Sequence, residues 1–210
     1  MKFRPLLVAV QLPAILSQIS IPFGNARSLF ETPRVMNADE LRSLQAPLKD
    51  RYRQDGRSAI VSLHATARVL PNQAACEVDC HQGTCTAGLH PAAGGDSTQA
   101  CSGDMLLQAL VACSGVTLST VAVAMSIPID SATVTASATM DFRGTLGICR
   151  ETAVGIQTLN LRFEISSAAS DEQLQKLVQL TERYCVVLQT LTQPSCQLTT
   201  EFCRTPLQSP

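Results

Sequence analysis

The amino-acid sequence predicts an α+β fold, and three patterns lead to this expectation. Apolar and polar residues alternate over 59–69, 133–142 and 158–165, which is the period of strands with one buried face. Residues 105–129 carry no charge over 25 positions, which indicates a long helix in the core. Residues 170–181 repeat apolar side chains at helical spacing. Strands, a buried helix, more strands and final helices in this order are typical of the α+β class.

The composition is that of one globular domain of ordinary size with a short extension. The chain has 210 residues, of which 45% are hydrophobic and 16% charged, so it can build a core. Its 16 Lys and Arg balance 17 Asp and Glu, and only 4% of the residues are aromatic. A nucleic-acid-binding protein needs a basic surface, often with stacking aromatic side chains. The sequence therefore excludes a nucleic-acid partner.

The cysteine count predicts a reducing compartment. Nine cysteines cannot all pair within one chain, whereas a secreted disulfide protein normally pairs its cysteines. We therefore expect a cytoplasmic protein in which a few thiols have special chemistry. The cysteines occupy positions 76, 80, 85, 101, 113, 149, 185, 196 and 203.

Residues 1–35 form an extension ahead of the predicted domain. Two basic residues precede a weakly apolar run, and no acidic residue occurs before Glu31. This pattern fits a secretory signal or an organellar transit peptide, and Met36 can also serve as a translation start. An exported or organellar location is thus the alternative to the cytoplasm. We expect the domain over 36–193 and a flexible, proline-punctuated tail over 194–210.

The first half of the domain is predicted to contain a helix and then strands. A polar, helix-like stretch spans 36–53, and the first alternating strand follows over 59–69. Residues 76–80 and 85–89 flank a short turn and predict a hairpin. A loop rich in glycine and alanine follows at 91–96.

The uncharged stretch predicts a helix over 104–125 that ends before Pro128. About 20 apolar residues would also suffice to cross a bilayer. Polar side chains interrupt this run, however, and acids rather than basic clusters flank it at Asp104 and Asp130. We therefore expect a core helix wrapped by sheet, and no membrane partner.

The last helices have clear start signals. Ser170 is a suitable N-cap with Gln173 three residues later, and two acids occupy the first turn between them. Residues 184–188 then begin a further short helix.

Two cysteine motifs resemble the signatures of the OsmC/Ohr family. Residues 104–113, DMLLQALVAC, look like the family's acidic-Leu-Leu-x-Ala-Leu-x-x-Cys helix. Residues 182–191, ERYCVVLQTL, resemble its second signature, which is commonly Cys-Pro-Val followed by a small helix. Cys113 and Cys185 stand 72 residues apart in the expected order, and the resemblance covers about 58–191.

The resemblance implies a thiol peroxidase that acts on organic hydroperoxides. It also implies an intertwined homodimer in which the sheets of both subunits enclose each long helix. Cys113 would be the peroxidatic residue and Cys185 the resolving one, with a dithiol or thioredoxin-type reductant reopening their disulfide. An acid at the start of the helix, here Asp104, would hold an activating arginine. No cofactor and no metal are implied.

The predicted site needs something that stabilises the Cys113 thiolate. A free thiol has a pKa near ~8.5, and burial raises it further. Cys113 is about ten residues into its helix, beyond the reach of that helix's own dipole. We therefore expect the fold to supply a cation, which in the family is an arginine of the first hairpin. No arginine occurs over 71–100. The nearest candidates are Arg68, Arg51, Arg53 and Arg57.

Several alternatives remain open. Asp104 can simply favour its helix start, because a first-turn acid suits the helix dipole without any catalytic part. His90 either lines a pocket or lies exposed in its loop. A non-catalytic dimer could bind a small hydrophobic ligand, or the cysteines could act as a redox switch. A zinc site is not expected, because no paired C-x-x-C occurs among the cysteines near His81.

Overall fold

The computed structural model describes residues 35–80, 83–193 and 196–204. The chain divides into two units, Met1–Val35 and Met36–Pro210, and the description below concerns the second. The targeting signals considered for 1–35 fall outside the described residues, apart from Val35. Within the expected tail, residues 196–204 form neither helix nor strand.

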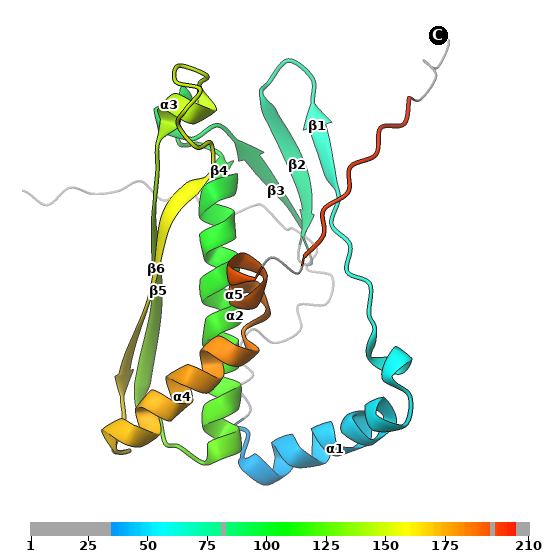
Figure 1. Ribbon diagram of the computed structural model, residues 1–210, viewed down its shortest axis with the longest axis vertical. Helices are drawn as coiled ribbons and strands as arrows, with labels where there is room; N and C mark the ends of the chain where they lie inside the picture. The colour runs from blue at the N-terminus through cyan, green and yellow to red at the C-terminus, as the bar shows by residue number, and fades with distance from the viewer. Residues whose placement is uncertain (1–34, 81–82, 194–195, 205–210) are drawn as a thin grey trace, which may run out of the picture. The chain divides into compact units, whose positions relative to one another are not determined.

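The described chain begins with the helix α1, Ala38–Gln54, as the sequence predicts (Figure 1). A capping box fixes its start, because the Asn37 side chain accepts the Glu40 N–H while the Glu40 carboxylate accepts the Asn37 N–H. One 3₁₀ turn, Gly56–Ala59, follows the helix.

A four-stranded sheet has the order β1-β2-β3-β4. Its strands are β1 (Ala67–Leu70), β2 (Ala75–Cys80), β3 (Gly83–Gly88) and β4 (Ala100–Cys101). The first three are antiparallel, and β4 pairs with β3 in parallel. The predicted hairpin is confirmed, with pairing that continues to Cys80 opposite Gly83.

The predicted strand 59–69 is shorter in the structure. Only Ala67–Leu70 is a strand, while residues 60–66 are extended chain that belongs to no sheet. The alternating pattern is present, but a strand also needs a neighbour for its backbone groups, and in the described part of the chain none runs beside 60–65. Ile60 and Leu63 are accordingly 78% and 88% exposed.

The long helix α2, Ser102–Met125, confirms the helix predicted over 104–125. It packs against β5, α4 and α5, and the side chains it buries fully recur at every fourth position. These are Leu110, Ser114, Leu118 and Ala122. Within one chain, therefore, one side of α2 is buried, and Val116 on another side is 70% exposed. Within the described residues α2 is also the one helix long and apolar enough to cross a membrane by length and composition.

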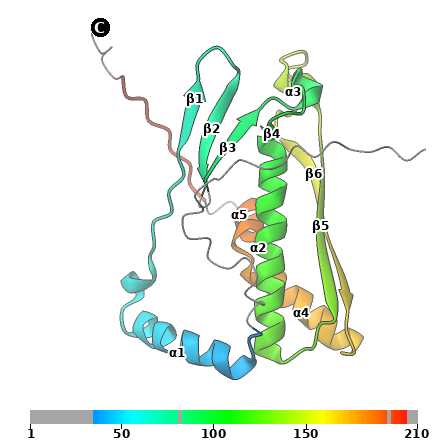
Figure 2. The ribbon, with the colours of Figure 1, turned by 180° about the vertical axis from the view of Figure 1, so that it is seen from behind.

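A second sheet contains two long antiparallel strands. They are β5, Ser131–Met140, and β6, Ile156–Ser166, where the sequence predicts strands. A short helix that the sequence analysis does not predict, α3, Phe142–Thr145, lies in their connection. Figures 1 and 2 show both strands running alongside α2.

The helices α4, Asp171–Tyr184, and α5, Val186–Thr192, complete the fold. The predicted capping box is present, with Ser170 and Gln173 each accepting the other's backbone N–H. The core joins α2 to α4 through Leu118, Ala122, Ile127 and Leu177. The fold is therefore α+β, as predicted, and α4 and α5 both contact α2.

Candidate functional site

The packing of α4 and α5 on α2 brings Cys113 and Cys185 together. Cys113 lies midway along α2 and is half-buried, whereas Cys185 lies between α4 and α5 and is fully buried. The Cys185 side chain lies close enough to the Cys113 thiol to lower the pKa of that thiol. Two of the three predicted site residues are therefore neighbours in space.

The turn at Cys185 explains this geometry. Cys185 ends α4 and starts α5 with an extended backbone, φ −72° and ψ 107°. Its N–H donates to the Thr181 carbonyl, and its own carbonyl accepts the Gln189 N–H, each at 2.9 Å. The chain changes direction between two helices there, and the first backbone N–H groups of α5 reach the Cys113 sulfur.

Hydrogen-bond donors lower the pKa of the Cys113 thiol. Burial raises this pKa, but the Val187 backbone N–H, the Cys185 side chain and the Val186 backbone N–H lower it by more. The Thr117 hydroxyl contributes in the same direction. The net result is a pKa below the ordinary value of a cysteine, because donors that point at sulfur stabilise the thiolate. Within the described residues of one chain, neutral donors rather than a cation lower this pKa.

The arginines considered as activators have other contacts. Arg68 pairs with Glu77 across β1 and β2, with 3.0 Å between the charged groups. Arg53 and Arg57 pair with neighbouring aspartates, and the Arg51 guanidinium lies over the Tyr52 ring.

Asp104, the third predicted site residue, does not join the cysteine pair within one chain. It is exposed in the first turn of α2, nine residues before Cys113. At 1.5 Å and 100° per residue, this separation amounts to about 13 Å along the helix and about half a turn around it. Asp104 instead lines a cavity of about 330 Å³ on the other side of α2.

His90 also lines this cavity, so the first of its two alternatives holds. Its ring stacks on Phe142, with 4.9 Å between centroids and 24° between planes. Its Nδ1 atom accepts the Ala92 N–H at 3.0 Å. Cys101 and several apolar side chains complete the lining.

Ser114 is a site residue that the sequence analysis misses. Its hydroxyl oxygen lies 3.3 Å from the Cys185 sulfur, and both residues are fully buried. A signal was present in the sequence, because Ser114 is the one polar member of the stripe that α2 buries at every fourth position.

The remaining thiols do not form a comparable pair. All nine cysteines are free. In the hairpin, Cys85 lies opposite Val78 rather than Cys80, so the two cysteines are offset by two residues. Among the described residues, which leave out His81, no group of three or more His, Cys, Asp or Glu side chains is placed to hold a metal ion.

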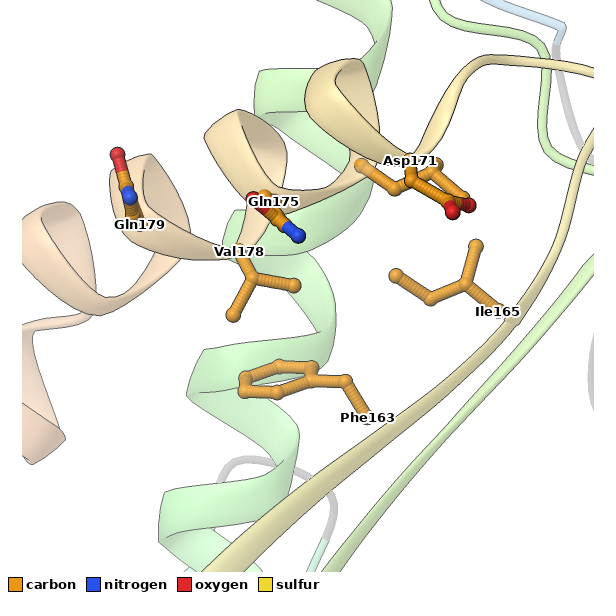
Figure 3. A pocket seen from close by; sticks show the side chains of 7 residues that line it. Phe163, Ile165, Asp171, Gln175, Val178 and Gln179 are labelled. Carbon is orange, nitrogen blue, oxygen red and sulfur yellow. The ribbon is translucent and has the colours of Figure 1, made fainter.

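An open groove of about 530 Å³ lies between α4 and β6 (Figure 3). Phe163, Ile165 and Val178 line it together with the polar ends of Asp171 and Gln175. No thiol or imidazole borders this groove, so it offers no reactive group.

The fold and the cysteine pair define an α+β protein with a donor-stabilised thiol. Residues 94–201, about half of the chain, match the family model described as OsmC-like protein, and the chain belongs to the OsmC family. No match is found among curated proteins.

Solved structures share this fold. An OsmC-like protein from Mycoplasma pneumoniae is 22% identical, with 64% of this chain and 90% of that chain covered and a TM-score of 0.53. An organic hydroperoxide resistance protein from Elizabethkingia anophelis is 17% identical, with 64% and 91% covered and a TM-score of 0.52. Another from Legionella pneumophila is 13% identical, with 63% and 90% covered and a TM-score of 0.51. At such identities the likeness establishes the fold, and the function has to be argued from the site.

Proposed function

We propose that this protein is a thiol-dependent peroxidase that reduces organic hydroperoxides through Cys113 and Cys185. The observation that carries the proposal is the Cys113 thiol, whose pKa is lowered by nearby donors that include a second, buried cysteine. A thiolate is the nucleophile in peroxide reduction, and a nearby thiol is what resolves its oxidised form. Two solved structures with this fold bear the name of organic hydroperoxide resistance proteins, which supports the substrate class.

The reaction runs in three balanced steps. The Cys113 thiolate attacks the terminal peroxide oxygen, the O–O bond breaks, and the departing alkoxide takes a proton to become an alcohol, leaving a sulfenic acid on Cys113. The Cys185 sulfur then attacks the Cys113 sulfur, and the hydroxyl group leaves as water with the Cys185 proton. A dithiol or thioredoxin-type reductant finally reduces the disulfide by thiol–disulfide exchange.

The proposal includes a homodimer. Three large apolar side chains are exposed: Val116 on α2 is 70% exposed, and Ile60 and Leu63, which belong to no sheet, are 78% and 88% exposed. Exposed apolar surface of this kind can mark an interface with another protein chain. A second copy that covers α2 and adds a strand beside residues 61–65 would bury this surface and pair the backbone groups of that segment. Asp104 would then act, if at all, through residues of the partner subunit.

A reducing compartment, the cytoplasm, is part of the same proposal. All nine cysteines are free thiols, and the resolved disulfide would have to be reopened by a cellular dithiol system.

The test uses the reduced full-length chain and one equivalent of cumene hydroperoxide. We expect one equivalent of cumyl alcohol and a Cys113–Cys185 disulfide in peptide maps, both absent from Cys113→Ser and the disulfide reversed by a dithiol. Cys101→Ser is the matched control, because Cys101 is also half-buried at α2 but lines the cavity on its other side. If Cys113 stays reduced while the exposed Cys196 and Cys203 oxidise slowly, the peroxidase proposal fails.

One observation favours a second candidate, a non-catalytic binding protein. The cavity of about 330 Å³ beside Asp104 is lined by Leu107, Met140 and Ile156 as well as by His90. Such an apolar pocket with few polar groups fits a small hydrophobic ligand. This candidate would be supported if the wild-type protein shows no peroxidase activity in the test above and nevertheless binds a hydrophobic probe.

A further inference from the structure

The contact between Ser114 and Cys185 joins two distant parts of the chain. Ser114 Oγ lies 3.3 Å from Cys185 Sγ, across 71 residues of sequence, and neither residue is exposed. Ser114 belongs to α2, directly after Cys113, while Cys185 belongs to the turn between α4 and α5. The position of the Cys185 sulfur is therefore fixed from α2, the helix that carries the other thiol.

This buried hydroxyl has a specific partner. Burying a hydroxyl costs free energy unless it forms a hydrogen bond, and among the described residues no buried side-chain oxygen or nitrogen lacks one. The other fully buried hydroxyl, on Thr181, donates to a carbonyl of its own helix, that of Leu177, at 2.9 Å. Ser114 instead faces a sulfur on another element. The otherwise apolar stripe of α2 thus contains its one hydroxyl at the point of contact with Cys185.

We propose that Ser114 is a positioning residue that holds the Cys185 thiol toward Cys113 and so sets the rate at which Cys185 closes the disulfide. The proposal rests on the proposed function, in which Cys185 is the resolving cysteine. A serine hydroxyl accepts from an S–H group and, after rotation, donates to a thiolate. Ser114 can therefore keep the Cys185 sulfur in place both before and after that sulfur loses its proton.

The step that Ser114 assists is the attack of Cys185 on Cys113, in which one bond forms and one bond breaks. The Cys185 sulfur, having lost its proton to solvent, forms a bond to the Cys113 sulfur. The bond from the Cys113 sulfur to its leaving group breaks, and the leaving group departs with the electron pair and a proton. The leaving group is hydroxide after peroxide oxidation and methanethiolate in the assay below, so resolution can be measured without any peroxide.

The assay starts from the reduced full-length chain and methyl methanethiolsulfonate. Because Cys113 is half-buried and Cys185 is fully buried, we expect this reagent to convert Cys113 to its methyl disulfide first. Quenched samples are mapped by mass spectrometry, and the rate at which the methylthio group on Cys113 is replaced by the Cys113–Cys185 disulfide is followed between pH 6 and 9. The variant Cys185→Ser defines the signal in the absence of resolution.

We expect Ser114→Ala to slow this closure at least tenfold, because the contact that orients the Cys185 sulfur is lost. Circular dichroism verifies the fold of each variant, and alanine is a good helix former. Thr181→Val, which removes the other fully buried hydroxyl, should close within about twofold of the wild-type rate. Ser114→Thr, which restores a hydroxyl, should recover closure.

Each outcome decides the inference. Closure by Ser114→Ala at the wild-type rate overturns it, and so does equal slowing by Thr181→Val, which would indicate a general packing effect. Failure of the wild type to close after methylthiolation overturns it as well. Failure of cumene hydroperoxide to oxidise Cys113, with closure still dependent on Ser114, refutes the peroxidase proposal and leaves the role of Ser114 in a thiol–disulfide pair supported.

Discussion

Replacing Val186 with proline removes one backbone N–H that stabilises the Cys113 thiolate and leaves the rest of the site in place. Val186 is the first residue of α5, where proline is well tolerated because that N–H has no partner within the helix. The preceding residue, Cys185, already has the extended backbone that proline requires before it, with φ −72° and ψ 107°. The Val186 side chain is 67% exposed, so the ring meets no packed core.

The expected effect follows from the strength of a hydrogen bond to a charged group, about 1.5–3 kcal/mol. Cys113 is half-buried, so water can replace part of the lost interaction. Removal of the Val186 N–H should therefore cost about 1 kcal/mol of thiolate stabilisation. That corresponds to a roughly fivefold smaller thiolate fraction at neutral pH. The Val187 N–H, which lowers the pKa of Cys113 more than the Val186 N–H does, stays in place. The pKa of Cys113 should therefore rise without returning fully to that of an unassisted buried thiol.

The measurement is the rate of Cys113 alkylation by iodoacetamide from pH 5 to 10, read by peptide mapping. Val186→Pro should shift the profile to higher pH and react about fivefold more slowly at neutral pH. Val186→Ala, which keeps the N–H but shortens the side chain, separates the amide from the side chain and should follow the wild-type profile. An unchanged or faster Val186→Pro protein, folded by circular dichroism, would refute the assignment of α5 as the source of thiolate stabilisation.

Three further predictions test the fold, the surface charge and the assembly. Leu177→Ala should lower the free energy of unfolding by about 3 kcal/mol in denaturant titrations, because Leu177 is fully buried, whereas Leu198→Ala at an 89% exposed position should change it by less than about 0.5 kcal/mol. The Arg143 side chain donates hydrogen bonds to Asp141 and lowers the pKa of that carboxyl from 3.8 to about 2. The pair therefore stabilises the fold above pH 3.8, and this contribution is lost as the pH falls toward 2. Carbon NMR of Asp141 should show a titration midpoint at about 2, and Arg143→Gln should return that midpoint toward 3.8. Leu63→Arg should convert the proposed dimer to monomer in light scattering, and a variant that stays dimeric would remove residues 60–66 from the interface.

Local signals in the sequence were sufficient for most elements of the fold. The capping box at Ser170, the alternation that became β5 and β6, and the uncharged run that became α2 each depend on neighbours in the chain, which a sequence displays. The strand expected over 59–69 fails in part because pairing depends on a second strand, and alternation alone carries no information about one.

The candidate site likewise combines features that the sequence displays with features that depend on neighbours in space. Cys113 and Cys185 could be matched to family motifs, and the structure places them close enough for Cys185 to lower the pKa of Cys113. The donors that lower the pKa of Cys113 within one chain could not be found from residue types, because backbone N–H groups have no sequence signature. Ser114 was visible only as a polar residue in an apolar stripe until the turn at Cys185 gave it a partner.

Stabilisation of the Cys113 thiolate by neutral donors and stabilisation by a cation depend differently on salt concentration. A thiolate held by an arginine loses stabilisation as salt screens the pair, with a Debye length that falls from about 10 Å at 0.1 M to about 3 Å at 1 M. A thiolate held by the Val186 and Val187 amides is stabilised at contact distance by groups without net charge, so the pKa of Cys113 should change little over the same range. Alkylation of Cys113 by the neutral reagent iodoacetamide, measured at both salt concentrations, distinguishes the two. A large loss of reactivity in 1 M salt would mean that a cation, from this chain or from a partner subunit, reaches the sulfur after all.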